Sequence, residues 1–287
     1  MPAPSEGIDI AQSILQRLRA GWTSKNSLLC VGLDPVRERL PAAFRSGPDG
    51  FRDFCCAIVD ATAGEACAFK PQAAHFAAVG AEDQLAEVIA YIHARHPDVP
   101  VILDAKRGDI GATAEFYAIE AFQRYGADIV TVNPYLGPES LEPFLAFPDR
   151  GVAILCRTSN PGNAWIQCHP EDDPVFLRVA RSVAEWNERG NLMLVAGATY
   201  PEDMARIRSV APTVPLLVPG IGAQGGDLRA VLEAGLDARG QGLLISASRS
   251  ILYAGAGEDF ASAAQEAAVK LRDSISRCAR DLLRRSA

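Results

Sequence analysis

The chain has 287 residues, a net charge of −7 at pH 7 and 48% hydrophobic residues, which is the composition of a globular protein with a large core. The acidic balance argues against nucleic acid and anionic membranes as main partners. No apolar run approaches the roughly 20 residues of a membrane helix, and the N-terminus lacks the basic stretch of a signal peptide, so we expect a cytoplasmic protein. Seven cysteines without a C-x-x-C pair indicate free thiols in a reducing compartment.

Eight short segments are predicted to be strands, because they are apolar without alternation, as in strands buried on both faces. They span 27–33, 66–69, 99–103, 128–132, 151–156, 192–196, 215–218 and 242–246. Helical periodicity predicts a first helix at about 8–20 and helices after the strands at 51–63, 82–95, 110–125, 139–146, 174–189, 201–210, 226–234 and about 258–283. The segment 162–173 is predicted to be an irregular, mobile loop.

The order of these elements predicts the fold. Strict alternation of strands and helices indicates a parallel sheet. Eight strand–helix units in 287 residues favour a closed (β/α)8 TIM barrel of the α/β class, with residues 1–287 forming one domain. A doubly wound open sheet is the alternative, but it usually has fewer strands and a nucleotide-binding fingerprint after the first one.

The segment Val99–Gly111 carries the strongest chemical signal. Side chains two apart on a strand point the same way, so Asp104 and Lys106 are expected to share a face where the third strand ends. Asp109 is expected to cap the next helix, where an acid is favoured. A structural ion pair is the alternative for Asp104 and Lys106. Because burying each charge costs several kcal/mol, a functional role is favoured.

Polar side chains follow most of the predicted strands at the point where each strand ends. They are Asp34, Lys70, Asp104, Lys106, Asn133, Ser159, Thr199 and Arg249. In a TIM barrel these strand ends meet at one mouth, where active sites lie. The alternative, that loops are simply polar, does not predict so many charged groups at the first positions after strands.

The segment Pro219–Gly226 contains the spacing G-x-G-x-x-G. It follows the seventh strand rather than the first and lacks the later acidic residue of a dinucleotide fingerprint. Loops after strands seven and eight of a barrel commonly bind phosphate, so Gly220, Gly222 and Arg249 are interpreted as a phosphate site. A flexible turn with a surface arginine is the alternative.

Metal ligands are less well supported. His93 and His96 are three residues apart near a predicted helix end, where histidines are also favoured as surface residues. His75 and His169 stand alone, and no carboxylate–histidine spacing indicates zinc. No metal site is therefore expected.

Several of these segments resemble one known family. Asp104-Ala-Lys106-Arg-Gly-Asp109-Ile110 is similar to the D-x-K-x-x-D-I signature of the orotidine 5′-phosphate decarboxylases. Residues 29–35, Phe69-Lys70-Pro-Gln and Pro219-Gly-Ile-Gly resemble its first-strand, second-strand and phosphate-loop motifs. Lys70-Pro-Gln and Arg157-Thr-Ser159-Asn-Pro-Gly resemble its longer bacterial subfamily. The resemblance implies a homodimeric barrel, without metal or organic cofactor, that converts orotidine 5′-phosphate to uridine 5′-phosphate and CO2 in the last step of de novo pyrimidine biosynthesis.

The resemblance also implies roles for the matching positions. Lys106 would protonate the pyrimidine carbon as CO2 leaves, and Asp104 would lie against the substrate carboxylate. Asp109, with Ile110 and Thr113, would reach into the active site of the neighbouring subunit, so that the dimer shares its sites. The other implied contacts are Lys70 and Asp34 with the ribose, Ser159 with the pyrimidine ring, and Gly220, Gly222, Gln224 and Arg249 with the phosphate.

Two segments depart from the family pattern. Ala73–Ala77 lacks the aromatic residue and glutamate often found there in the longer subfamily, and no glycine flanks Arg249.

Two other functions stay open. The runner-up enzyme is a metal-dependent phosphosugar lyase or aldol-type synthase on the same barrel. A barrel that only binds a nucleotide is less favoured, because binding alone does not need a buried lysine between two acids.

Overall fold

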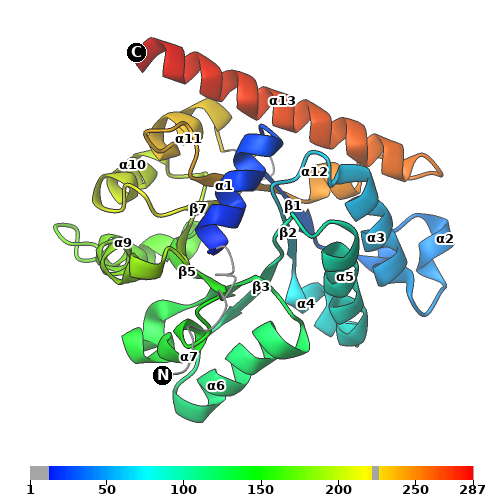
Figure 1. The fold of residues 1–287 in the computed structure, drawn as a ribbon, viewed down its shortest axis with the longest axis horizontal. Coiled ribbons are helices and arrows are strands. Elements are labelled where there is room, and N and C mark those ends of the chain that lie inside the picture. The colour runs from blue at the N-terminus through cyan, green and yellow to red at the C-terminus, as the bar shows by residue number, and fades with distance from the viewer. Residues whose placement is uncertain (1–12, 222–225, 287) are drawn as a thin grey trace, which may run out of the picture.

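The computed structural model describes residues 13–221 and 226–286, in which eight parallel strands form a nearly closed barrel surrounded by helices (Figure 1). The strands are β1 (Leu29–Leu33), β2 (Ala68–Pro71), β3 (Ile102–Arg107), β4 (Ile129–Val132), β5 (Gly151–Arg157), β6 (Leu192–Ala196), β7 (Leu216–Pro219) and β8 (Leu243–Ala247). Their order is β2-β1-β8-β7-β6-β5-β4-β3. Single bridges from Phe69 to Val101 and from Gln72 to Asp104 bring β2 beside β3. The predicted (β/α)8 barrel is confirmed.

The helices lie outside the strands. The α-helices of the described residues are α1 (Ile14–Ser24), α2 (Ala42–Arg45), α3 (Gly50–Thr62), α4 (Ala73–Ala77), α5 (Glu82–Arg95), α6 (Gly111–Ile119), α7 (Glu142–Leu145), α8 (Ala164–Gln167), α9 (Val175–Trp186), α10 (Pro201–Val210), α11 (Leu228–Gly235), α12 (Arg249–Leu252) and α13 (Phe260–Ser286). None of the helices in these two ranges is long and apolar enough to cross a membrane.

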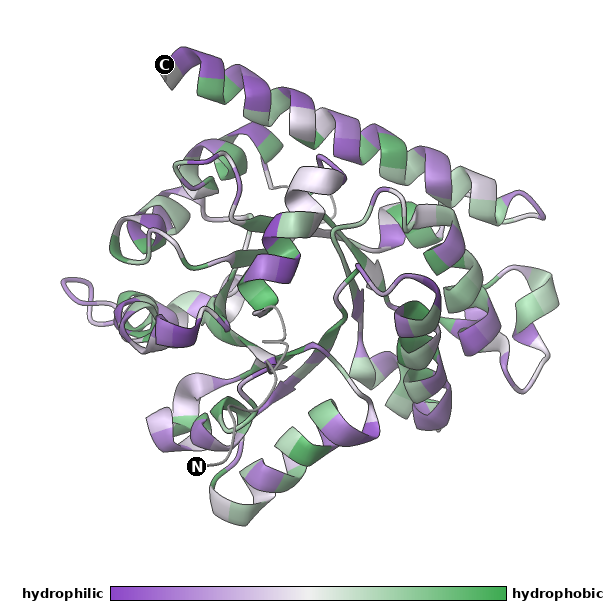
Figure 2. Cartoon of the chain, viewed as in Figure 1, coloured by the Kyte–Doolittle hydropathy of each residue, from purple (hydrophilic) through white to green (hydrophobic). Residues whose placement is uncertain are grey.

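The core follows from the apolar strands. Every residue of β1, β2, β4, β6 and β8 is buried. Figure 2 shows the strands hydrophobic along most of their length, while the surrounding helices carry both hydrophobic and hydrophilic residues. Strands packed on both faces have no solvent-facing side, which explains why the sequence shows no alternation there.

Helix α1 lies across the N-terminal end of the barrel (Figure 1). It begins with a capping box, in which the side chains of Ser13 and Gln16 each accept a hydrogen bond from the backbone N–H of the other residue. Arg17 then donates to Asp128 at 2.5 Å, and the same carboxylate accepts from the N–H of Val101 at 2.8 Å. Helix α1 is thereby fixed to the barrel end opposite the carboxyl ends of the strands.

The start and end of the helix predicted at 110–125 differ from expectation. Asp109 is not its cap: the N-cap is Ile110, whose backbone is extended and whose side chain makes no capping bond, while Asp109 Oδ1 accepts from the N–H of Ile110 at 2.8 Å. After Ile119 the chain forms a π-helical turn at Glu120–Arg124, where Glu120 pairs with Arg107 at 2.9 and 3.1 Å. The capping prediction was wrong because the chain stays extended through one more residue.

Other differences are local. The helix predicted at 139–146 is divided into a 3₁₀ turn at Pro138–Ser140 and α7. The segment 162–173 is not wholly irregular, because it contains α8. The first helix runs to Ser24, and its predicted residues 8–12 lie outside the described residues.

Candidate active site

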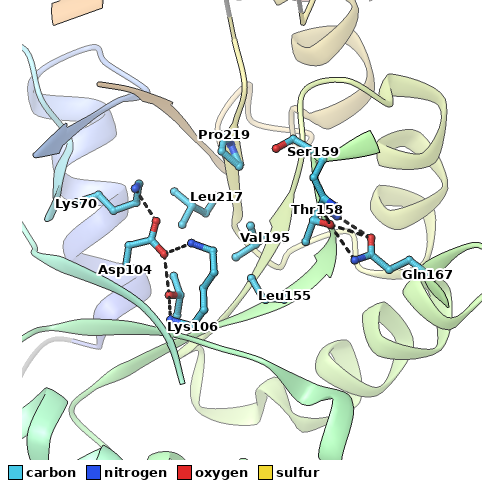
Figure 3. Close-up of a pocket in the computed structure, with 12 residues that line it drawn as sticks. Lys70, Asp104, Lys106, Leu155, Thr158, Ser159, Gln167, Val195, Leu217 and Pro219 are labelled. Carbon is cyan, nitrogen blue, oxygen red and sulfur yellow. Dashed lines mark hydrogen bonds and ion pairs between the residues drawn. The ribbon is translucent and has the colours of Figure 1, made fainter. Parts of the chain in front are cut away.

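Two adjoining cavities open at the carboxyl ends of the strands. The larger, of about 460 Å³, has charged residues on one wall and polar residues on the other, with an apolar floor between them (Figure 3). These three groups are Lys70, Asp104 and Lys106; Thr158, Ser159 and Gln167; and Leu155, Val195 and Leu217. The smaller cavity, of about 210 Å³, contains Asp34, Ser248, Gly220 and Arg249 and shares Lys70, Asp104 and Ser159 with the larger one. The arrangement suits an elongated ligand with two chemically different ends.

The charged wall is a row of three side chains from β2 and β3. Lys70 Nζ donates to Asp104 Oδ2 at 2.7 Å, and Lys106 Nζ donates to Asp104 Oδ1 at 2.5 Å (Figure 3). Asp104 and Lys70 are buried, whereas 48% of the Lys106 side chain is exposed to the cavity and solvent. Each carboxylate oxygen of Asp104 therefore accepts a hydrogen bond from one lysine. Of the three side chains, Lys106 has the largest surface open to a ligand.

A local distortion of β3 presents Lys106 to the cavity. Its φ is +48°, and the register of β3 against β4 shifts between Leu103 and Arg107. Thr131 of β4 stabilises this bulge, since its hydroxyl accepts from the N–H groups of Ala105 at 3.0 Å and Lys106 at 2.9 Å. The same hydroxyl donates to Asp104 Oδ1 at 3.1 Å. Bulges of this kind aim side chains at functional sites.

Neighbouring charges keep Asp104 and Lys70 ionised. Burial raises the pKa of Asp104, but the adjacent ammonium groups of Lys70 and Lys106 outweigh it and hold that pKa well below its usual range. Burial lowers the pKa of Lys70, but Asp104 and Asp34 outweigh it and raise that pKa. Asp104 and Lys70 are therefore both charged at neutral pH.

Asp34 directly follows β1 and lies in the smaller cavity. Its Oδ1 is buried and accepts no hydrogen bond from the described protein atoms. Its charge also contributes to the raised pKa of Lys70. A buried carboxylate oxygen without a partner is costly, so this atom is available to a donor on a ligand, such as a hydroxyl group.

The predicted phosphate site involves residues that follow β7 and β8. Gly220 has φ +105°, a conformation that favours glycine, and Arg249 begins α12. Gly32 packs against Ser248 so closely that a Cβ on Gly32 would stand 1.9 Å from the Ser248 hydroxyl oxygen. The predicted phosphate contacts Gly222 and Gln224 lie outside the described residues.

The opposite wall depends on residues that the sequence patterns did not reveal. Gln167 of α8 accepts from the N–H of Thr158 at 2.9 Å and donates to its hydroxyl at 2.9 Å (Figure 3). The neighbouring Ser159 lies against Gly197, where a Cβ would stand 2.7 Å from the Ser159 backbone. The sequence did not predict Gln167 as a site residue, because its segment was interpreted as a loop. It also did not predict Thr131, beside the charged wall, because Thr131 has the pattern of an ordinary strand residue.

Three predicted site residues do not line either cavity of this chain. Asp109 and Ile110 directly precede α6 and Thr113 lies in its first turn, and none of the three is among the lining residues of the two cavities. Ile110 is 58% exposed. The same barrel therefore does not bring them to its own cavity.

Within the described part of the chain, histidine and carboxylate groups do not gather into a metal site. Residues 13–221 and 226–286 contain no group of three or more His, Cys, Asp or Glu side chains placed to hold a metal. His93 Nε2 lies 2.9 Å from Asp128, while His96 Nε2 lies 3.1 Å from Asp60. The two histidines thus have separate partners.

The family model, two similar sequences and a similar structure all carry the same name. Residues 27–266 match the orotidine 5′-phosphate decarboxylase / HUMPS family. The chain is 59% identical over 260 residues to an orotidine 5′-phosphate decarboxylase of Azoarcus sp. (strain BH72), covering 90% of this chain and 96% of that one. It is 56% identical over 265 residues to the protein of that name from Dechloromonas aromatica, covering 92% and 98%. Among solved structures, the Leishmania donovani OMP decarboxylase is 41% identical, with a TM-score of 0.80 and coverage of 93% and 99%.

Proposed function

The chain belongs to the orotidine 5′-phosphate decarboxylase / HUMPS family, and we propose that Lys106 supplies the proton when it converts orotidine 5′-phosphate to uridine 5′-phosphate and CO2. This decarboxylation is a step of pyrimidine biosynthesis. The role of Lys106 is supported by its position: its ammonium group lies 2.5 Å from Asp104, and its side chain is the most exposed of the three in the charged row. Lys70 is buried against the other oxygen of Asp104.

The chemistry needs a fixed positive charge at the reacting carbon. As the bond to the carboxyl group breaks, its electron pair stays on the ring carbon, where no ring π-system accepts it. An ammonium group held beside that carbon stabilises the developing negative charge and then transfers a proton to it. The apolar floor of Leu155, Val195 and Leu217 keeps the local dielectric low, which strengthens this interaction.

Asp104 positions the proton donor and stays ionised throughout. Its low pKa, caused by Lys70 and Lys106, ensures that a carboxylate faces the substrate carboxylate. The repulsion between the two is relieved as CO2 departs, while the attraction between Asp104 and Lys106 keeps the ammonium group directed at the carbon. Asp104 therefore acts on both the ground state and the transition state.

The binding contacts follow the division into two cavities. We assign the unpaired Asp34 carboxylate and Lys70 to the ribose hydroxyls, and Ser159 to the pyrimidine ring. We assign Gly220 and Arg249 to the phosphate. The phosphate is remote from the reacting carbon, so its binding energy is available for positioning the substrate.

We also propose that the chain forms a homodimer with shared active sites. Large apolar side chains are exposed along α6 and after β4, which are neighbouring parts of the surface. They are Ile110, Phe116, Ile119, Tyr135 and Leu136. A patch of this kind marks an interface. Docking of two copies here would carry Asp109, Ile110 and Thr113 towards the partner's cavity.

A cytoplasmic location is part of the same proposal. All seven cysteines are free. Free thiols fit a reducing compartment.

The test is the ultraviolet absorbance change of orotidine 5′-phosphate with purified protein in excess chelator. We expect fast conversion by the parent, none by Lys106→Ala, and parent-like conversion by Lys270→Ala, which removes an exposed lysine of α13 far from the cavity. Turnover by Lys106→Ala at the parent rate would remove Lys106 from the mechanism. No conversion of orotidine 5′-phosphate by the parent would favour a metal-dependent reaction on phosphosugars instead.

A further inference from the structure

The turn that carries Asp34 is held by side chains from two distant elements. Asp34, Pro35 and Val36 join β1 to the 3₁₀ turn Arg37–Arg39. Tyr253 Oη accepts from the N–H of Val36 at 2.8 Å and donates to the carbonyl oxygen of Asp34 at 3.2 Å. The hydroxyl therefore closes the turn at both of its ends.

A second side chain holds the middle of the turn. His75 Nδ1 lies 2.9 Å from the carbonyl oxygen of Pro35. Because a carbonyl only accepts, this contact requires a proton on Nδ1. His75 belongs to α4, the segment Ala73–Ala77 that departs from the pattern of the longer subfamily, so the departure has a structural use in this chain.

The Tyr253 ring is itself fixed in place. The Arg39 guanidinium carbon lies 3.8 Å from the ring centroid, and Phe54 stacks on the ring at 6.2 Å with an interplanar angle of 11°. Burial raises the pKa of the Tyr253 hydroxyl, so it stays protonated and can both donate and accept. A ring restrained in this way holds the turn it bonds in one position.

The same tyrosine connects the turn to the anion end of the site. Tyr253 directly follows α12, which begins at Arg249, and the N–H of Tyr253 donates to the Arg249 carbonyl at 3.3 Å. Ile251 and Leu252 of this helix are buried. One anchored helical turn thus joins Arg249, at one side of the smaller cavity, to the turn that carries Asp34.

We propose that Tyr253 is a positioning residue that sets the Asp34 carboxylate against the sugar of the substrate, with His75 as its second support. The inference rests on the proposed function, because it takes Asp34 as the contact to a ribose hydroxyl. Asp34 Oδ1 is buried and unpaired, so its position decides how well a hydroxyl can reach it. Loss of the Tyr253 hydroxyl leaves the Asp34 carbonyl and the Val36 N–H without their partner and releases the turn.

The experiment combines the variant with a change in the substrate. Tyr253→Phe and the parent are compared on orotidine 5′-phosphate and on its 2′-deoxy and 3′-deoxy analogues. We expect Tyr253→Phe to lower kcat/KM about tenfold on the full substrate, the order of one well-made hydrogen bond, and less than about twofold on the analogue that lacks the hydroxyl bound by Asp34. A loss of kcat/KM caused by a displaced Asp34 depends on the sugar hydroxyl, whereas a general loss of structure lowers kcat/KM equally on all three substrates.

Two further comparisons separate positioning from stability. Tyr91→Phe removes a tyrosine hydroxyl that donates to Asp60 at 2.7 Å outside the site, and we expect it to leave kcat/KM unchanged on all substrates. His75→Leu should reproduce the sugar-dependent loss, while His75→Asn, whose amide can still donate to the Pro35 carbonyl, should restore most of the activity.

The outcomes distinguish this inference from the function on which it rests. An equal loss on all three substrates, or no loss in Tyr253→Phe and His75→Leu, would overturn the positioning role while the decarboxylase activity stands. Absence of turnover by the parent would overturn the proposed function and the inference with it.

Discussion

Lys70 Nζ and Asp104 Oδ2 lie 2.7 Å apart across the seam where the barrel closes. Lys70 belongs to β2 and Asp104 to β3, and these two strands are joined only by single bridges in the part of the chain that the structure describes. The ion pair therefore links the two ends of the sheet as well as supplying charge to the active site. Replacing a proposed catalytic group that makes a structural contact of this kind is expected to lower the stability of the fold.

Asp104→Asn is expected to destabilise the fold, because it leaves the buried Lys70 without its main counter-charge. We expect a loss of about 3 kcal/mol or more in the free energy of unfolding, as for other broken buried ion pairs. Lys106→Ala removes a half-exposed partner of the same carboxylate and should cost about 1 kcal/mol or less. Denaturant unfolding of both variants measures the difference. Equal stabilities would contradict the structural role of the Lys70–Asp104 pair.

Asp128 is expected to make stability fall in acid. Burial raises the pKa of this carboxyl, but hydrogen bonds from His93 and Arg17 outweigh it and lower the pKa from 3.8 to about 2. Because the folded pKa lies below the unfolded one, the stabilisation is complete above about pH 4 and is lost as the pH falls through about 2. The shift corresponds to roughly 2 kcal/mol.

The measurement is the free energy of unfolding between about pH 5 and about pH 2. Asp128→Asn should flatten this dependence, while Asp172→Asn, an exposed carboxylate with no described partner contact, should keep the parent slope. If Asp128→Asn keeps the full slope, other carboxylates account for the acid sensitivity.

Much of the fold was predictable because most strand residues are buried on both faces of the sheet. The helix at 82–95, the strand at 192–196 and the helix at 201–210 have the predicted bounds. Apolar runs that end in polar residues identify the strands and their carboxyl ends, and the barrel topology then brings those ends together. The grouping of Asp34, Lys70, Asp104, Lys106, Ser159 and Arg249 around two adjoining cavities follows from this rule.

The features that could not be predicted depend on contacts between residues that are far apart in the sequence. The bulge that turns Lys106 into the cavity is stabilised by Thr131, and nothing in the residues around Lys106 indicates it. The Asp34 turn is held by Tyr253, which lies 219 residues away along the chain. Local patterns describe elements, whereas these contacts exist only once the barrel has closed.

Gly197→Ala is expected to impair the polar wall without unfolding the protein. A Cβ at position 197 would stand 2.7 Å from the backbone of Ser159, so the loop after β5 must shift. Displacement of a positioning group by about 1 Å can reduce kcat/KM by about a hundredfold. Gly64→Ala is the matched control, because a Cβ at Gly64 meets nothing within 4 Å. Steady-state kinetics check the prediction, and a parent-like kcat/KM for Gly197→Ala would mean that Ser159 needs no fixed position.

Mixing two inactive variants tests the shared active site. Lys106→Ala lacks the proposed proton donor, and Asp109→Ala lacks the residue proposed to reach the partner's cavity. In a hybrid dimer one site receives both changes and the other receives neither, because a two-fold dimer pairs each cavity with the partner's α6. Random pairing of equal amounts makes half of the dimers hybrids, so about one quarter of the parent activity should return.

Subunit exchange must be shown independently, by mixing copies labelled with two dyes and following energy transfer between them. The Lys106→Ala protein mixed with itself under the same conditions is the control and should stay inactive. Since Asp109 lines neither cavity of its own chain, we expect any effect of Asp109 on activity to depend on a second copy. Exchange without any return of activity would therefore place Asp109 outside the partner's site and leave the exposed apolar side chains of α6 to another contact.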